Sequence, residues 1–399
     1  MMAARMLGRY GQGELALYNN FLMLSVLLFS IGLPAAIVHF IASGKFQKNK
    51  LGGVLLRVMM FACLGFIILA GIVFSISNTI SILPELIHTH GYWLIVIGIH
   101  LLCTMAIGFL QAILQAESEF KKSAYIIVCG SLLLCLVYAT YYFQWIPVSV
   151  EPLPFIIITL CSIAALQLMV CLLMVSQVNK DYLQFTKVQW VDISPLLWFA
   201  SLAFATNFIQ FLSYKMDIWF VHHFHGEAET GIYALAVSLA QMLWLLPSAV
   251  QSVIYTYISS QNDKALSIEK TISTTKQIAV YAIVAGIASG LLSVYLVPYL
   301  FGFEFNESAK IIQILLIGII PFCLSMPISA YFAATHKVTI NLHSAIIGFV
   351  ICLLADIILI PTYGILGAAI ASVLSYISTL LYLLIRFKLE SKGHPKYYS

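Results

Sequence analysis

Charged side chains are scarce in this chain. Asp, Glu, Lys and Arg together make up 9% of its 399 residues, whereas a typical globular domain has about 25%. Hydrophobic residues make up 61% instead, and the mean hydropathy is +0.98. A sequence with so little charge predicts an all-α integral membrane protein. The net charge of +4, without a basic tract, argues against a nucleic-acid partner.

Motifs of soluble chemistry are missing as well. The 8 cysteines include no Cys-x-x-Cys pair, so we expect them to be small buried hydrophobes and not disulfides or metal ligands. The chain has no Gly-x-x-x-x-Gly-Lys loop, and its connections are too short for a nucleotide-binding or catalytic domain. We therefore expect a protein that is not an enzyme, holds no cofactor and does not hydrolyse ATP.

Long apolar segments fill most of the sequence. A helix that crosses a bilayer needs about 20 mostly apolar residues, and the sequence predicts eleven such spans. They are residues 15–42, 52–78, 92–115, 123–145, 153–177, 194–221, 231–258, 276–301, 309–334, 339–361 and 364–386.

The loop charges predict the orientation of these spans. All of the 20 Lys and Arg residues fall on one side except Arg5, Arg9, Lys215 and Lys310, and the richer side is expected to be cytoplasmic. The C-terminus is then inside, and eleven spans place the N-terminus outside, against the usual bias. A further helix before Met1 would remove this conflict. The alternative is an N-in signal anchor at 15–42, but it would invert every later loop.

A short repeat organises the chain. Gly13-Glu14-Leu15-Ala16-Leu17 and Gly231-Ile232-Tyr233-Ala234-Leu235 share the pattern Gly-x-x-Ala-Leu, and 231 − 13 gives a shift of 218 residues. The same shift superimposes the predicted spans in order. Two units of six helices, the first lacking its opening helix, would be parallel repeats, which are typical of alternating-access transporters. The predicted divisions are an N-terminal lobe at 1–177, an interfacial linker at 178–193, a C-terminal lobe at 194–388 and a cytoplasmic tail at 389–399.

Polar side chains inside the spans are candidates for a substrate cavity. On the span 194–221 they occupy an arc about 120° wide, at 100° per residue, and such an arc must face water or protein. Interhelical hydrogen bonding is the alternative interpretation. The cavity candidates are Asn207, Gln210, Tyr214, Asp217, His100, Thr104, Gln111 and Gln241.

Ionisable groups in the spans suggest two further roles. Asp356 lies deep in its span and Asp217 ends the polar arc, so both are candidates for proton or sodium coupling. A protonated, hydrogen-bonded Asp356, or one wetted near the outer end of its span, is the alternative. The candidates for binding a diphosphate are Lys215, Lys310, Arg57 and Lys276. Positive-inside flanking explains Arg57 and Lys276 equally well, and snorkelling explains Lys215 and Lys310.

Two outer segments are rich in histidine, namely His88-Thr89-His90 and His222-His223-Phe224-His225. Histidines at such spacing can bind zinc. Short exposed loops of this kind are more often simply solvated, so we expect no metal site.

Three segments resemble a known family. Ala4–Leu17 resembles the stretch after the first helix of polysaccharide-type flippases, which export O-antigen or lipid-linked oligosaccharide and belong to the multidrug/oligosaccharidyl-lipid/polysaccharide exporter superfamily. Tyr214–Asp217 with Thr230–Ala236 resembles the start of that family's second lobe, and Leu246-Pro247 its mid-helix proline. The chain departs from the family in lacking the first helix.

The resemblance implies a V-shaped bundle of two six-helix lobes in a bacterial inner membrane. It would move a polyprenyl-diphosphate-linked oligosaccharide to the outer leaflet, with membrane lipids and polysaccharide polymerase machinery as candidate partners. A cation-coupled multidrug exporter of the same superfamily is an alternative, and it would need a compact, acid-rich site in one lobe. A polysaccharide polymerase or ligase is another, and it would need a long outer loop. The spread of neutral polar residues over several helices favours the sugar substrate.

Overall fold

The computed structural model describes residues 1–42, 46–76, 92–145, 151–184, 190–259 and 263–391, with the single positions 44, 186 and 261. These residues form helices and short connections, with no strand among them, and the predicted all-α class is confirmed. His88 and His90 of the first histidine-rich segment, and Lys187 of the predicted linker, lie outside the described residues.

The chain divides into two compact units. The N-terminal unit comprises residues 2–7 and 14–208, and the C-terminal unit comprises Met1, residues 8–13 and residues 209–399. The predicted two-lobed architecture is confirmed. Residues 8–13 belong with the C-terminal unit, which the sequence did not predict.

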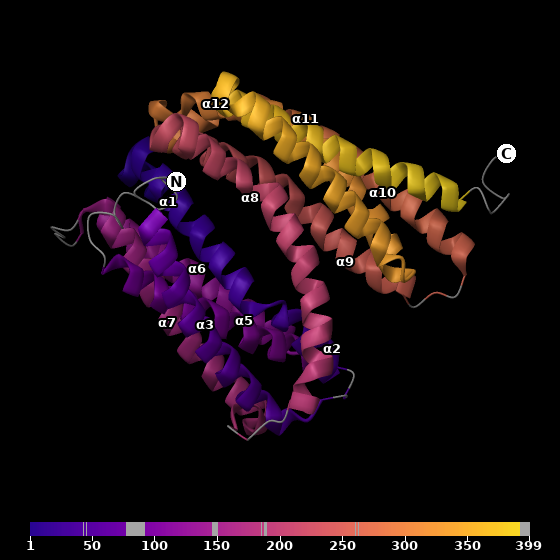
Figure 1. Cartoon of the computed structure of the whole chain (residues 1–399). Coiled ribbons are helices and arrows are strands. Elements are labelled where there is room, and N and C mark those ends of the chain that lie inside the picture. The colour runs from indigo at the N-terminus through magenta and orange to yellow at the C-terminus, as the bar shows by residue number, and fades with distance from the viewer. Residues whose placement is uncertain are drawn as a thin grey trace. The chain divides into compact units, whose positions relative to one another are not determined.

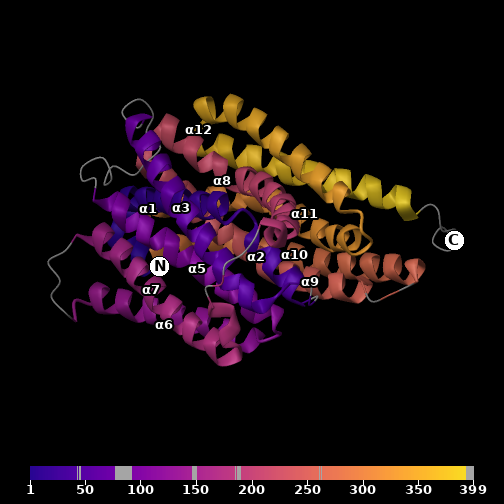
Figure 2. The ribbon, with the colours of Figure 1, turned by 60° about the horizontal axis from the view of Figure 1, so that its bottom comes forward.

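Six α-helices and a 3₁₀ turn build most of the N-terminal unit. They are α1 (Met2–Ser30), α2 (Leu33–Ala42), α3 (Lys48–Ile76), α5 (Trp93–Ala116), α6 (Phe120–Tyr142), α7 (Pro152–Val178) and η1 (Lys180–Leu183). Helix α5 packs against α2 and α7, and α6 lies along α7 (Figures 1 and 2). The central position of α5 explains why so many of its residues, including Ile97, Leu101 and Phe109, are fully buried.

The C-terminal unit begins within a long helix. Its elements are α8 (Trp190–Gln241, from Ile209 onward), η2 (Met242–Trp244), α9 (Leu245–Ser259), α10 (Lys264–Phe301), η3 (Phe303–Phe305), α11 (Asn306–Ala334) and α12 (Val338–Ser391). Helix α11 packs against α9, α10 and α12 (Figure 1). Local sequence sets the ends of α10, because the Asp263 side chain accepts hydrogen bonds from the backbone N–H of Ala265 and Leu266. Gly302, with φ of 113°, follows its last residue.

Nine helices in the described part of the chain are long and apolar enough to cross a membrane. Two of them, Ser194–Ser259 with 66 residues and Val338–Ser391 with 54, are much longer than the about 20 residues that one crossing needs. Both contain a glycine bend, at Gly226 (φ 79°) and Gly364 (φ 58°). Each bent helix is therefore compatible with two spans, so the nine helices are compatible with the eleven predicted spans.

Contacts across the two bends show that each one is a hairpin. Tyr233 donates a hydrogen bond to Asp217, and these residues lie nearly equally far on either side of Gly226. Ser375 donates to the backbone oxygen of Gly348 across the Gly364 bend. Positive φ with an extended ψ is open to glycine alone, so these two residues determine where the chain reverses.

The predicted 218-residue repeat has a direct structural counterpart. Gly8 (φ 64°, ψ −174°) and Gly226 (φ 79°, ψ −174°) have the same unusual conformation, and 226 − 8 is again 218. A Cβ added to Gly13 would lie 2.0 Å from the Glu227 carbonyl oxygen, and one added to Gly231 would lie 1.9 Å from that of Arg9. The partners are also 218 residues apart, since 227 − 9 is 218. The two segments therefore cross with reciprocal contacts, as in a local two-fold arrangement.

The predicted interfacial linker begins inside the core of the N-terminal unit. Tyr182 of η1 is fully buried and donates a hydrogen bond to Oε1 of Glu117, just beyond the end of α5. Lys48 Nζ lies 2.5 Å from the same oxygen. The hydrogen bond from Lys48, with that from Tyr182, lowers the pKa of Glu117 below its usual value. This network anchors the start of the linker to α3 and α5.

We expect Gly231→Ala to lower the melting temperature of the purified protein, although alanine favours a helix by about 1 kcal/mol over glycine. The added methyl would overlap the Arg9 carbonyl oxygen, and backbone on both sides prevents relief. Gly108→Ala is the matched control, because no atom lies within 4 Å of its added Cβ. Thermal unfolding in detergent measures both variants. A Gly231→Ala protein that melts at or above the wild-type temperature would contradict the close crossing.

Candidate functional site

Asp217 is the centre of a buried polar cluster in the C-terminal unit. It lies on the first arm of the α8 hairpin and is 2% exposed. Its Oδ2 accepts hydrogen bonds from the Tyr233 hydroxyl at 2.5 Å and the Ser372 hydroxyl at 3.3 Å. Its Oδ1 accepts from the backbone N–H of Ile218 at 2.8 Å. Both arms of α8 and the second arm of α12 therefore converge on this carboxyl group.

Asp356 adds a second carboxyl group to the cluster from the first arm of α12. It is 1% exposed, and its Oδ2 lies 3.6 Å from the Cys352 thiol. Its Oδ1 has no hydrogen-bond partner among the described residues. The same thiol lies 3.8 Å from the backbone oxygen of Ser213, four residues before Asp217, so Asp356 is close to the part of α8 that carries Asp217. Lys215 is two residues before Asp217 on that helix. One ammonium group can balance one of the two carboxylates, so the pair as a whole favours a bound proton or cation.

A cluster of four aromatic rings lies beside the carboxyl pair. Tyr214 is three residues before Asp217 on α8, and Tyr376 is four residues after Ser372 on α12, so each shares a helix face with a member of the polar cluster. Trp244 of η2 and Phe322 of α11 complete it, with ring centroids 5.0–6.1 Å apart in all six pairs.

The sequence analysis identified Tyr214 but missed Trp244, Phe322 and Tyr376. One signal was available for Trp244. Tryptophan in membrane proteins gathers at the two interfaces, whereas Trp244 lies near the middle of the segment between Gly226 and the end of α9, three residues before Pro247. No comparable local signal marks Phe322 or Tyr376, because aromatic residues are common in apolar spans.

Two other cavity candidates border the aromatic cluster. Gln210 is exposed, and its Nε2 donates a hydrogen bond to the Tyr214 hydroxyl at 3.3 Å. Gln241 lies directly before η2 and is half-buried. The structure therefore brings Gln210, Tyr214, Asp217 and Gln241 into one region of the C-terminal unit.

The remaining cavity candidates lie in the N-terminal unit. His100 is 7% exposed, and its Nδ1 lies 2.7 Å from the Tyr18 hydroxyl. Thr104 donates a hydrogen bond to the backbone oxygen of His100. Gln111 is half-buried on the same helix, and Asn207 is exposed on α8. The contact with Tyr18 turns His100 toward the interior of its own unit.

The diphosphate candidates are dispersed. Arg57 is exposed on α3 of the N-terminal unit. In the C-terminal unit Lys276 and Lys310 are exposed on α10 and α11. These two helices are joined by a short turn and lie side by side, and Gln313 of α11 donates a hydrogen bond to the Gly290 carbonyl of α10. Lys276 is 18 residues farther from the connecting turn than Lys310, which places them about 27 Å apart along the helices. These two lysines are too far apart to bind the same diphosphate together.

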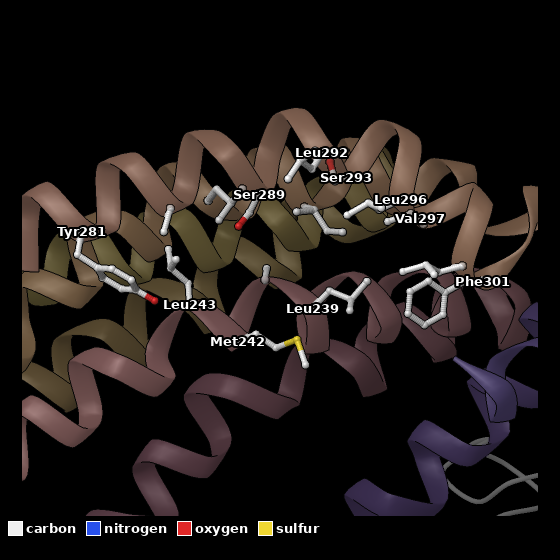
Figure 3. Close-up of a pocket in the computed structure, with 15 residues that line it drawn as sticks. Leu239, Met242, Leu243, Tyr281, Ser289, Leu292, Ser293, Leu296, Val297 and Phe301 are labelled. Atoms are coloured by element: carbon white, nitrogen blue, oxygen red, sulfur yellow. The ribbon is translucent and has the colours of Figure 1, made fainter. Parts of the chain in front are cut away.

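A separate apolar pocket lies between η2, α10 and α11. It has a volume of about 340 Å³ and is lined mainly by apolar side chains, with Tyr281, Ser289 and Ser293 as its polar side chains (Figure 3). Met242 and Leu243 of η2 line one wall. Its lining suits a hydrocarbon chain and has too few polar groups for a sugar.

Metal ligands are not gathered in the described part of the chain. No group of three or more His, Cys, Asp or Glu residues there is arranged to hold a metal ion. The His225 ring instead lies 2.8 Å from the Ile360 carbonyl oxygen, beside the Gly364 bend.

Residues 2–310 match the profile of a family described as polysaccharide biosynthesis proteins. The chain belongs to this family. No curated protein matches the sequence significantly. Its fold resembles that of a multidrug resistance MATE transporter of the MOP superfamily in an inward-facing conformation, with a TM-score of 0.72 and 12% identity over 100% of this chain and 94% of that one.

Two further solved structures are similar. The lipid II flippase MurJ has a TM-score of 0.71 at 16% identity, covering 96% of this chain and 86% of its own. A eukaryotic MATE transporter has a TM-score of 0.64 at 13% identity, covering 98% and 96%. The predicted resemblance to a polysaccharide-type family is confirmed by the family match, and the fold is that of these solved transporters. This member of the family is a multi-pass membrane protein.

Tyr233→Phe tests the hydrogen bonding of the carboxyl cluster in this family member. Removing the hydroxyl leaves a buried acceptor with one donor fewer, so we expect a loss of about 1.5–3 kcal/mol of unfolding free energy. Tyr363→Phe, at an exposed position of α12, is the matched control and should be nearly neutral. Thermal or denaturant unfolding measures both. Equal stability of the two variants would contradict a strong Tyr233–Asp217 bond.

Proposed function

We propose that this protein is a flippase for a polyprenyl-diphosphate-linked oligosaccharide. It works by alternating access in the bacterial inner membrane, with its C-terminus in the cytoplasm, and serves the synthesis of a surface polysaccharide such as O-antigen. It is a transporter and not an enzyme, and the polymerase that uses the exported lipid is a candidate partner. The observation that carries this proposal is the match of residues 2–310 to a polysaccharide biosynthesis family.

The arrangement of polar groups supports a sugar substrate. Gln210 is exposed and Tyr214 and Gln241 are half-buried, and all three are neutral polar residues that can hydrogen-bond hydroxyl groups. Among the cations, Lys215 is nearest to them, and it is the strongest candidate for the diphosphate. Arg57, Lys276 and Lys310 are candidates for attracting the head group to either end of the path.

Deleting the gene should trap lipid-linked repeat units on the cytoplasmic leaflet of the host, because the hydrophilic head group cannot cross the bilayer unaided. The measurement is the leaflet distribution of polyprenyl-diphosphate oligosaccharides, with surface polysaccharide as a second readout. Restoring the gene on a plasmid is the control. Normal surface polysaccharide in a deleted strain that has no redundant exporter would count against the proposal.

We further propose that the Asp217–Asp356 pair couples transport to a proton or sodium gradient. Both side chains are buried, Asp356 lies close to the part of α8 that carries Asp217, and Asp356 Oδ1 has no protein hydrogen-bond partner among the described residues. A proton or an alkali cation would satisfy that oxygen and balance the excess negative charge.

Asp356→Asn should uncouple transport from the ion gradient, because an amide carries no charge to be neutralised. The measurement is transport in proteoliposomes with and without imposed pH and sodium gradients. Glu307→Gln is the matched control, since this carboxylate is exposed in the same unit. An Asp356→Asn variant that responds to the gradients as the wild type does would exclude the coupling role.

A cation-coupled multidrug exporter is the second candidate function. One observation favours it, because the two buried carboxyl groups form the compact acidic site that such an exporter requires. Expression in a strain lacking its own exporters distinguishes the two functions. Drug resistance that depends on Asp356, without any effect on surface polysaccharide, would support the exporter.

A further inference from the structure

The four aromatic rings beside the carboxyl pair do not have equal access to solvent or ligand. Phe322 and Tyr376 are 8% and 3% exposed, whereas Tyr214 and Trp244 are half-buried. The first two rings therefore form a buried back wall, and the second two present ring surface. Tyr214 and Trp244 have centroids 5.3 Å apart at an angle of 52°, so their faces are tilted toward each other.

Hydrogen-bonding groups border this ring surface with capacity that the fold does not use. The indole Nε1 of Trp244 is a buried donor with no hydrogen-bond partner among the described residues. The buried amide Nε2 of Gln241 makes no hydrogen bond of good geometry there either, although the Gln241 side chain lies beside that of Tyr376. Such groups are costly in a membrane unless a ligand or water satisfies them.

The position of Trp244 does not suit an interfacial anchor. It lies at the middle of the predicted span 231–258, and it ends a 3₁₀ turn that interrupts the helix. Short 3₁₀ breaks of this kind often mark functional positions. Met242 and Leu243 of the same turn line the apolar pocket (Figure 3), so the turn contributes to both the pocket and the aromatic cluster.

The combination of ring faces and neutral donors fits a pyranose ring better than an organic cation. One face of a pyranose presents C–H groups that pack on an aromatic ring, and its rim of hydroxyls accepts and donates hydrogen bonds. A quaternary ammonium ion would pack on the rings but could not accept a bond from an indole or amide N–H. The acid closest in sequence to Tyr214, Asp217, is 2% exposed and already accepts three hydrogen bonds.

We propose that Tyr214 and Trp244, backed by Phe322 and Tyr376, form a sugar-binding platform, and that Trp244 is a specificity-determining residue. The site rests on the proposed flippase function and names the part of the substrate that it recognises. The sugar stacks on the indole or phenol face, and the N–H groups of Trp244 and Gln241 donate to its hydroxyls.

Binding to two lipids tests the platform. The probes are a polyprenyl diphosphate that carries a single hexose or N-acetylhexosamine and the same polyprenyl diphosphate without sugar, each titrated against full-length protein in nanodiscs. Trp244→Leu should weaken binding of the glycosylated lipid about tenfold, as expected when a stacking contact and a hydrogen bond are lost, and leave the sugar-free lipid unchanged. Trp244→Phe keeps the ring and should lose less.

Control variants exclude a general effect of losing an aromatic residue. Tyr281→Leu removes an aromatic side chain from the apolar pocket of the same unit (Figure 3) and should preserve the preference for the glycosylated lipid. Thermal unfolding identifies any variant that loses its fold. If Trp244→Leu does not fold, the binding of the two lipids is compared between wild type and Trp244→Phe, which retains an apolar ring.

Three outcomes separate the failures. Wild-type protein that binds neither lipid would overturn the proposed function itself. Wild-type protein that prefers the glycosylated lipid, with the preference intact in both Trp244 variants, would overturn the platform alone. Ethidium, an organic cation, is a third probe. Loss of ethidium binding in Trp244→Leu, with lipid binding unchanged, would also overturn the sugar platform and would indicate a drug site.

Discussion

The absence of water in the hydrocarbon core is the constraint on which the structure depends. Every polar group inside a span must find its partner within the protein, and the C-terminal unit shows how far this goes. Thr271 and Thr275 donate to carbonyls of their own helix, and the Asp217 carboxyl group draws donors from two other helical segments. Polar groups that remain unpaired among the described residues under this constraint, such as Asp356 Oδ1 and Trp244 Nε1, therefore carry functional information.

Close approach of backbone is the second way in which the fold is held together. Without a hydrophobic force between helices in lipid, small residues allow the packing that stabilises a membrane bundle. Gly13 approaches the carbonyl of Glu227, four residues before Gly231, and Gly231 approaches the carbonyl of Arg9, four residues before Gly13. The repeated sequence pattern thus corresponds to a repeated contact, and the bends at Gly8 and Gly226 place it.

The carboxyl pair and the aromatic cluster share helix faces. Tyr214 and Asp217 lie one turn apart on α8, and Ser372 and Tyr376 lie one turn apart on α12. A change of charge at Asp217 or Asp356 would act on the same two helices that position the proposed sugar platform. The proposed ion site and the proposed sugar platform therefore share the helices α8 and α12.

Composition, hydropathy and a five-residue repeat determined the all-α class, the approximate spans and the 218-residue register. These features can be read locally, because apolar segments prefer lipid to water and because the glycines of the repeat recur at a fixed spacing. The sequence also singled out Asp217 and Asp356, since a carboxyl group in an apolar span is costly wherever it occurs. Only the tertiary structure decided that Asp356 lies close to the part of α8 that carries Asp217, that His100 contacts Tyr18, and that Phe322 and Tyr376 join Trp244. The two carboxyl groups are 356 − 217 = 139 positions apart in the chain, and no local pattern encodes which helix faces will pack together.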